Sequence, residues 1–220
     1  MSHAGKQSFV FENPPAIAAH VSVAGPREGA GPLGKWFDTV LEDDLLGQKS
    51  WEKAESEMLR QCAQEAVRAS GMPETEIQAF LSGDLNDQII ASGFCARGLK
   101  TPFLGLYGAC STFAESLMLS ALMVNAGYFN ACAAVTSSHF CTAERQFRFP
   151  LEYGGQRTPT AQRTATASGA AVVSSDPASD IKISEVLPGR IIDKGITDIN
   201  NMGAAMAPAA IDTLTRYFSD

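Results

Sequence analysis

The stretch that decides the fold is YGACSTFAESLMLSALMVN, residues 107–125. A short apolar run, 101–106, leads into a Gly-Ala-Cys-Ser turn, and the turn leads into a helix over 113–125. Glu115 is the one charged residue of this helix, so apolar side chains surround nearly all of it. Because a helix that is apolar all round needs burial on every side, we expect this one to lie between two sheets.

Outward from this helix, strands and helices alternate along the chain. Apolar and β-branched runs predict strands at 16–24, 77–82, 101–106, 130–138, 164–175 and 181–192. Helical spacing and end signals predict helices at 50–70, 87–99, 113–125 and 202–218, the last starting near Pro208. Residues 25–47 are expected to form a long ordered loop, and 140–163 to be irregular. This order predicts an α/β fold with a mostly parallel sheet and crossover helices.

The clearest helix begins after Ser50, a residue that suits an N-cap, and stops before Gly71. Its apolar residues fall on one stripe at helical spacing: Trp51, Ala54, Met58, Leu59, Cys62, Ala66 and Val67. The polar residues Glu55, Glu57, Gln64, Glu65 and Arg68 are expected elsewhere on its surface. The pattern is typical of an amphipathic outer helix with Cys62 in the core.

Composition excludes several classes of protein. The chain has 220 residues, of which 45% are hydrophobic and 19% charged, as in ordinary globular proteins. Its 17 Lys and Arg against 24 Asp and Glu give a net charge of −7. We therefore expect no nucleic-acid partner and no attraction to an anionic membrane surface. Residues 1–15 lack an apolar core segment and no run reaches a membrane span, so we expect neither a signal peptide nor a transmembrane segment.

Cys110 is the strongest candidate for a functional residue. A strand, a turn and a helix in this order form the geometry of a nucleophile elbow, and the N–H groups at the helix start suit a reactive thiol or a bound anion. The alternative is a buried structural thiol, the fate of most free cysteines. None of the five cysteines forms a CxxC pair and no metal-ligand cluster is found, so we expect neither a metal site nor a disulfide framework.

His139 is the second candidate. The strand at 130–138 turns polar where it ends, at Thr136, Ser137 and Ser138, and His139 follows at once. Ligands of open α/β sheets gather beyond the carboxyl ends of the strands. The alternative is a histidine that is hydrogen-bonded within a loop, and both interpretations stay open.

The segment after His139 has a local excess of positive charge. Between Thr142 and Thr164 four arginines and two glutamates give +2 within a chain of net −7. The arginines are Arg145, Arg148, Arg157 and Arg163. Loop arginines suit carboxylate or phosphate recognition, and with a helix N-terminus nearby they would favour a small dianion. The alternative is a solvated loop with Glu–Arg pairs. No GxGxxG motif opens a helix, so no dinucleotide cofactor is expected.

The stretch YGACSTFAESL (107–117) resembles the nucleophile turn of the thiolase-like superfamily. That resemblance implies a layered αβαβα fold of two similar βαβαβαββ halves, with the Cys110 helix buried between sheets. More narrowly, the chain is similar to the stage V sporulation protein AD family. Four stretches carry this similarity: 29–38, 107–112, 136–161 and 195–210.

The family resemblance implies binding of pyridine-2,6-dicarboxylate (dipicolinate), free or as its calcium chelate, and help in its uptake into the developing spore. It implies partner proteins of the same sporulation operon at the membrane, a homodimer formed through the first half, and a peripheral place on the cytoplasmic side of the forespore or spore inner membrane. The residues carried over are Cys110, Ser111 and Thr112 of the nucleophile turn, and Ser137, Ser138 and His139 after the next strand. Arg145 joins this ligand-binding set by our own inference from the arginine-rich loop.

The resemblance also sets the domain boundaries that we expect. Residues 1–200 correspond to the N-terminal thiolase-like half, and 201–220 to the first helix of an incomplete C-terminal half. In thiolases the second half supplies the His and the His or Asn that complete catalysis. Three hypotheses result: a non-catalytic dipicolinate-binding protein, an acyltransferase with Cys110 as nucleophile, and a scaffold that docks a membrane complex.

Overall fold

A six-stranded sheet forms the centre of the computed structural model, which describes residues 2–4, 7–147, 163–176, 178–198 and 201–219. Its strand order is β4-β3-β8-β7-β5-β6. The strands are β3 (Ala16–Ala24), β4 (Thr39–Val40), β5 (Ala79–Asp84), β6 (Phe103–Gly105), β7 (Ala131–Ser138) and β8 (Ala167–Ser174). All pairs are parallel except those of β8, which is antiparallel to both β3 and β7. The prediction of a mostly parallel sheet is therefore confirmed, and the five parallel strands end at one edge, which we call the carboxyl edge.

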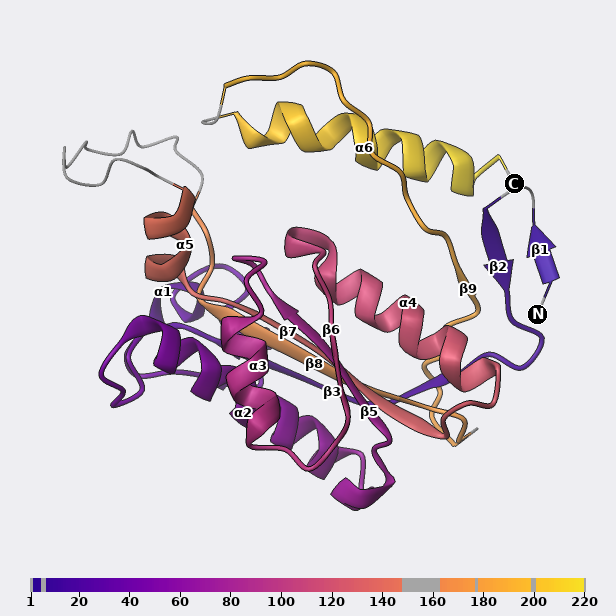
Figure 1. The fold of residues 1–220 in the computed structure, drawn as a ribbon, viewed down its shortest axis with the longest axis horizontal. Helices are drawn as coiled ribbons and strands as arrows, with labels where there is room; N and C mark the ends of the chain where they lie inside the picture. Colours follow the sequence, from indigo (N-terminus) through magenta and orange to yellow (C-terminus); the bar gives the residue numbers. More distant parts are fainter. Residues whose placement is uncertain (1, 5–6, 148–162, 177, 199–200, 220) are drawn as a thin grey trace.

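Helices cover both faces of this sheet (Figure 1). On one face, the α2 face, lie α2 (Trp51–Ala69) and α3 (Ile90–Arg97). On the other, the α4 face, lies α4 (Thr112–Asn125). Each face has its own apolar cluster: Met58 and Leu59 of α2 pack with Phe80 and Val135, whereas Val124 of α4 packs with Leu81 and other residues of the opposite sheet face. The fold is a layered α/β arrangement, as expected from the alternation of strands and helices.

The α2 helix follows its sequence pattern with one correction. The Ser50 hydroxyl accepts a hydrogen bond from the Lys53 N–H at 3.4 Å, and Gly71, at φ +71°, ends the helix turn. The stripe that contains Met58 and Cys62 is fully buried, as predicted. Glu55, expected outside the stripe, is only 2% exposed and belongs to the buried face.

The α4 helix begins where predicted, but its burial differs from the prediction. Its fully buried side chains include Ser116, Ser120 and Ala121, while Leu117 and Met118 are only half-buried. Among the described residues one sheet covers one side of this helix, and the chain after β9 passes over its other side (Figure 1). Burial on every side, as in a helix between two sheets, is thus not met by the part of the chain that the structure describes.

Three further segments correct the sequence-based assignment. Residues 140–147 form a helix, α5 (Phe140–Phe147), where irregular chain was expected. The strand predicted at 181–192 is reduced to β9 (Glu185–Val186) and an isolated bridge. β9 joins β1 (Ser2–Ala4) and β2 (Ser8–Val10) in a small antiparallel sheet that the sequence pattern did not reveal.

The long segment 25–47 is largely irregular, as expected, and holds short turns of helix. These and the other short helical elements are α1 (Pro26–Gly29), η1 (Gly34–Trp36), η2 (Glu74–Glu76) and η3 (Ala109–Ser111).

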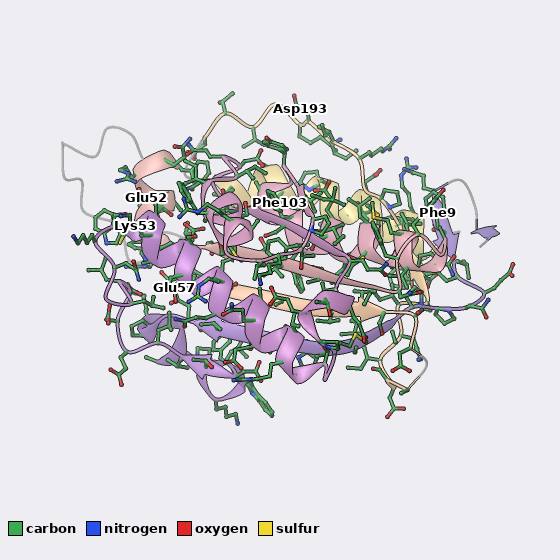
Figure 2. All side chains as sticks on the ribbon, turned by 60° about the horizontal axis from the view of Figure 1, so that its bottom comes forward. Phe9, Glu52, Lys53, Glu57, Phe103 and Asp193 are labelled. Carbon is green, nitrogen blue, oxygen red and sulfur yellow. The ribbon has the colours of Figure 1, made fainter. Side chains whose placement is uncertain are left out.

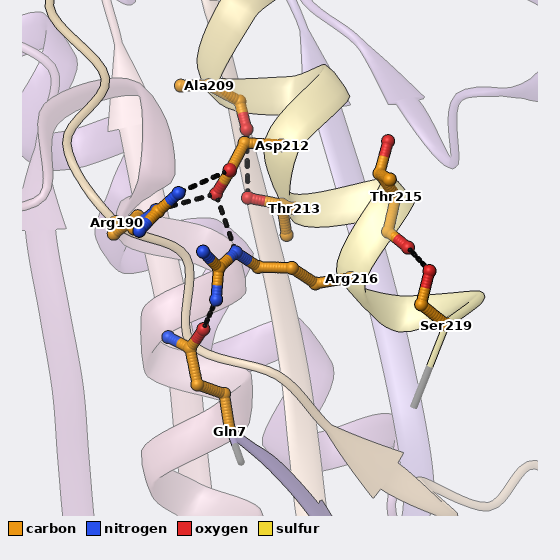
Figure 3. Close-up of polar contacts among 8 residues, drawn as sticks. All are labelled: Gln7, Arg190, Ala209, Asp212, Thr213, Thr215, Arg216 and Ser219. Atoms are coloured by element: carbon orange, nitrogen blue, oxygen red, sulfur yellow. Dashed lines mark hydrogen bonds and ion pairs between the residues drawn. The ribbon is translucent and has the colours of Figure 1, made fainter. Parts of the chain in front are cut away.

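The last helix, α6 (Met202–Tyr217), starts at Met202 and not near Pro208, which lies inside it. Asn201 caps it by accepting a hydrogen bond from the Ala204 N–H at 3.2 Å. None of its residues is buried. Polar contacts tie it to the preceding chain, because Asp212 accepts two hydrogen bonds from Arg190 and one from Arg216 (Figure 3).

Candidate functional site

The carboxyl edge gathers the segments that carry the predicted site residues. The loop 25–47 follows β3, the turn with Cys110 follows β6, and α5 follows β7. Register fixes the neighbours, since β5 pairs with β7 from Ala79 opposite Cys132 to Asp84 opposite Ser137. Loops at this edge of a parallel sheet are the usual place for a ligand.

The turn before α4 is tight and strained. Ala109 has φ +44°, a backbone conformation that residues other than Gly, Asn and Asp seldom adopt. A Cβ at Gly108 would lie 2.5 Å from the Glu115 carboxylate and 2.9 Å from the Ser111 Oγ, so a larger residue there would displace these two side chains. Cys110 is exposed at the tip of this turn, and the Ser111 hydroxyl donates to the Gly108 carbonyl at 2.8 Å. The predicted strand–turn–helix geometry around an accessible thiol is present.

Thr112, the first residue of α4, is fully buried. Its Oγ1 has no hydrogen-bond partner among the described residues. The surroundings are crowded: a Cβ at Gly83 would lie 2.9 Å from the Thr112 methyl group and 2.3 Å from the Leu106 carbonyl. A buried hydroxyl without a partner is unfavourable, and this one lies directly behind the Cys110 turn.

His139 is buried, at 1% exposure, and both of its ring nitrogens have backbone partners. Nδ1 accepts a hydrogen bond from the Cys141 N–H at 3.2 Å, and Nε2 lies 2.8 Å from the Asp44 carbonyl oxygen. Since a carbonyl only accepts, Nε2 carries the proton and the ring is the neutral tautomer that donates to Asp44. His139 therefore joins the end of β7 to the loop that leads into α2.

The sheet separates the predicted site residues into two groups. Side chains of a strand alternate between its faces, and in β7 Val135 packs in the α2-face cluster whereas Cys132 packs in the α4-face cluster. Ser137 shares the face of Val135 and donates to the Glu55 carboxylate of α2 at 3.0 Å. His139 continues on this face. Cys110 begins the helix on the opposite face.

The α4 face thus holds Cys110, Ser111, Thr112 and Ser138, and the α2 face holds Ser137, His139 and Arg145. Ser138 donates to the Ala165 carbonyl at 2.7 Å. Cys110, Ser111 and Thr112 are consecutive at the start of α4, Ser138 shares only their face of the sheet, and His139 lies on the opposite face from Cys110.

Arg145 is ion-paired with Glu52 and lies over the Trp51 ring, 6.0 Å from its centroid. Glu52 lies near the start of α2, close to α5 (Figure 2). Arg163 stacks on Phe140 at 4.1 Å. Arg148 and Arg157 lie outside the described residues. The two described arginines thus have partners on their own side of the fold.

Glu55 is a buried polar centre that sequence reasoning missed. Its Oε1 accepts from Ser137, and its Oε2 lies 2.9 Å from the Thr142 hydroxyl, which also lies 2.9 Å from the His139 carbonyl. Burial raises the pKa of Glu55 to about 7, and the nearby Asp84 carboxylate adds to this. Thr142 has one hydroxyl proton for two acceptors, so a protonated Glu55 supplies the missing hydrogen. The spacing of Glu55, four residues after Trp51 and three before Met58, places it within the apolar stripe of the helix, and this spacing could have indicated its burial.

A cavity of about 160 Å³ adjoins this centre, bordered by Glu55, Asp84, Thr142 and Arg145. Asp84 is 2% exposed and accepts from the Ser92 hydroxyl at 3.1 Å. Within the described part of the chain, no three His, Cys, Asp or Glu side chains are placed to hold a metal ion. Over the same residues, no helix combines the length and the apolar character that crossing a membrane requires.

The sequence matches a family model described as stage V sporulation protein AD over residues 5–220. It is 44% identical over 220 residues to Stage V sporulation protein AD of Bacillus subtilis (strain 168). This alignment covers 100% of the chain and 65% of the relative, so the chain spans just under two thirds of the relative's length.

Solved structures show the same fold at low identity. A Xanthomonas campestris OleA variant with cerulenin matches with a TM-score of 0.63 at 13% identity, over 94% of this chain and 70% of that one. Another variant of the same OleA matches with a TM-score of 0.51 at 14% identity, over 76% of this chain and 59% of that one. These similarities show the thiolase-like fold expected from the Cys110 turn.

Proposed function

Because the chain belongs to the stage V sporulation protein AD family, we propose that it binds dipicolinate and aids the uptake of this dianion into the developing spore, without catalysing a reaction. The observation that carries the proposal is the turn before α4, where an exposed Cys110 and Ser111 adjoin the buried, unpartnered hydroxyl of Thr112. This places hydrogen-bond donors at the start of a helix of 14 residues.

The chemistry of the turn suits a small dianion. The first turn of an α-helix leaves backbone N–H groups without intrahelical partners, and the helix dipole favours negative charge there. A carboxylate that reaches this turn would accept from these N–H groups. The Ser111 hydroxyl would have to leave the Gly108 carbonyl to donate to it, and the buried Thr112 hydroxyl would donate only to a ligand oxygen that enters behind the turn. The aromatic ring between the two carboxylates would then lie along the carboxyl edge.

The residues of the β7 end take different roles in this proposal. Ser138 lies on the same face as Cys110, and in this proposal its hydroxyl leaves the Ala165 carbonyl to contact the ligand. Ser137 and His139 contact Glu55 and Asp44, respectively, on the other face, so we assign them as positioning residues that fix the end of β7. Arg145 would act on the ligand only by leaving Glu52.

The remaining parts of the proposal concern assembly. The ligand enters free or as its calcium chelate, and the protein works beside membrane proteins of the same operon, peripherally at the forespore membrane. A homodimer through this half would use β6, which is one of the two edge strands of the sheet and exposes Leu104.

Calorimetric titration of dipicolinate into the protein tests the proposal, with benzoate as a monoanionic control and the calcium chelate as a second ligand. We expect saturable binding of dipicolinate that Cys110→Ala and Ser138→Ala each weaken. His139→Ala should weaken binding less, because it acts through the strand end. The absence of binding to a folded protein would overturn the proposal.

An acyltransferase with Cys110 as nucleophile is the second candidate, favoured by the accessible thiol on a strained strand-to-helix turn. The Cys110 thiolate would attack the carbonyl of an acyl thioester, keep the acyl group on Sγ and release the thiol, which takes up a proton. His139 has both nitrogens in backbone hydrogen bonds on the other face, which disfavours it as the base. Intact-mass detection of an acyl group on Cys110 would support this candidate, and no adduct with several acyl-CoA thioesters would exclude it.

A further inference from the structure

A larger cavity lies on the α2 face, away from the Cys110 turn. It has a volume of about 340 Å³ and is bordered by the C-terminal half of α2, the turn at Met72, η2 and the chain that enters β6. Phe80 and Ala133, the second residue of β5 and the third of β7, also line it. These residues come early in their strands, so the cavity lies toward the amino edge of the sheet, opposite the carboxyl edge.

The interior of the cavity is apolar. Its floor is made by Ile77, Phe80 and Ala133, each at most 4% exposed and part of the α2-face cluster. Met72 and Leu99 form half-buried walls. The cavity is open to solvent at its rim, so a ligand can enter it without a change in the fold.

The rim is polar and carries no net charge. Arg68 and Glu74 contribute one charge of each sign, and Arg68 is already ion-paired with Glu65. Gln64 and Thr101 offer hydrogen-bonding groups. The Gln64 Oε1 accepts from Arg60 at 2.7 Å, and its amide NH₂ has no acceptor among the residues that the structure describes. A balanced rim over an apolar floor favours an uncharged ligand over an anion.

We propose that this cavity binds a small, uncharged, mostly apolar molecule whose single polar group stays at the rim near Gln64 and Thr101. With a volume of about 340 Å³, the cavity has room for a bicyclic aromatic such as indole. The volume falls within the range of about 300–1,000 Å³ that is usual for ligand pockets. Met72, a flexible side chain at the wall, lets the opening adapt to the shape of the ligand.

Titration of indole into protein with labelled methyl groups, followed by NMR, tests the inference. We expect saturable shifts of the Met72, Ile77 and Leu99 methyl signals. The half-buried methyl groups of Met118 and Leu122 on α4 report adsorption to the other apolar surface, and they should stay unchanged. Shifts confined to α4, or shifts that do not saturate, would overturn the inference.

Variants in which a larger side chain fills the cavity give a second test of indole binding. Val67 lines the cavity and is only half-buried, so Val67→Phe should fill it and weaken indole binding at least tenfold. If thermal unfolding shows that this variant is misfolded, Ala133→Val fills the cavity from the sheet side. Cys110→Ser, in the separate site, should bind indole as the unaltered protein does. Indole binding that survives in a folded, filled variant would contradict the assignment.

Discussion

Replacing Glu55 with Gln should remove a pH dependence of stability that the buried carboxyl creates. Burial raises the pKa of Glu55 from its ordinary value of 4.5 to about 7. The folded protein therefore holds this proton more tightly than the unfolded chain does, and stability is highest below pH 4.5 and falls as the pH rises through about 7. At about 1.36 kcal/mol for each pKa unit, the loss reaches about 3 kcal/mol on the alkaline side.

Gln is the right substitution because it copies the protonated acid. Its carbonyl oxygen accepts from Ser137, and its amide donates to Thr142, which is then free to donate to the His139 carbonyl. Urea unfolding at intervals from pH 5 to 8 measures the effect. The free energy of unfolding should fall with pH in the unaltered protein and stay nearly level in Glu55→Gln, so that the variant is the more stable at pH 8.

Glu57→Gln is the matched control on the same helix. Hydrogen bonding from Arg60 lowers the pKa of the Glu57 carboxyl, so its contribution is already complete above pH 5 and the profile of this variant should run parallel to that of the unaltered protein. Parallel profiles for Glu55→Gln as well would refute the account of a buried acid that ionises near neutrality.

Three further outcomes are expected. Met58→Ala removes a side chain with 0% exposure and should lower the free energy of unfolding by about 2–5 kcal/mol in urea. Thr112→Val replaces an unpartnered buried hydroxyl, so it should raise stability by about 1 kcal/mol while it weakens dipicolinate binding in calorimetry. Asp212→Ala removes the contact of α6 with Arg190 of the preceding chain and the Asp212–Arg216 bond within the helix, and hydrogen exchange should quicken in α6 while the urea midpoint stays unchanged, since α6 buries no residue.

Local patterns were sufficient for the elements whose signals lie within one segment. The Ser50 cap and the apolar stripe placed α2, and the apolar run at 16–24 matches β3 in full. The turn around Cys110 was recognised because its small residues fit only a tight strand-to-helix connection. In each case the residues that form the element also carry the information that defines it.

Tertiary contacts decide the elements that were missed. Residues 143–146 are good helix formers, but eight residues are too few for a helix that is stable alone, and α5 is held by Thr142 and Ala143, which are buried. The run at 181–192 contains β-branched residues, yet it pairs only at Glu185–Val186 with β2 and at Lys182, which forms a single bridge to Ala16 of β3. Propensity cannot supply a partner strand from the other end of the chain.

The division of the site between two faces could be predicted only in part. Strand alternation puts Ser137 and His139 on one face and Ser138 on the other. Which of these faces carries α4 depends on strand order, which a single sequence does not reveal. Glu55 had a detectable signal, because it occupies an apolar position of the α2 stripe.

Protection of Cys110 from alkylation tests the central claim most directly. Cys110 is the exposed thiol, whereas Cys62, Cys95 and Cys132 are buried, with pKa values that burial raises to about 11, 12 and 12. A Cys141→Ser background removes the partly buried fifth thiol, so that intact mass reports iodoacetamide addition at Cys110 alone.

The account predicts that dipicolinate slows this reaction in proportion to its occupancy and that benzoate leaves it unchanged. An unchanged alkylation rate at dipicolinate concentrations that saturate binding would place the ligand elsewhere and contradict the assignment of the Cys110 turn.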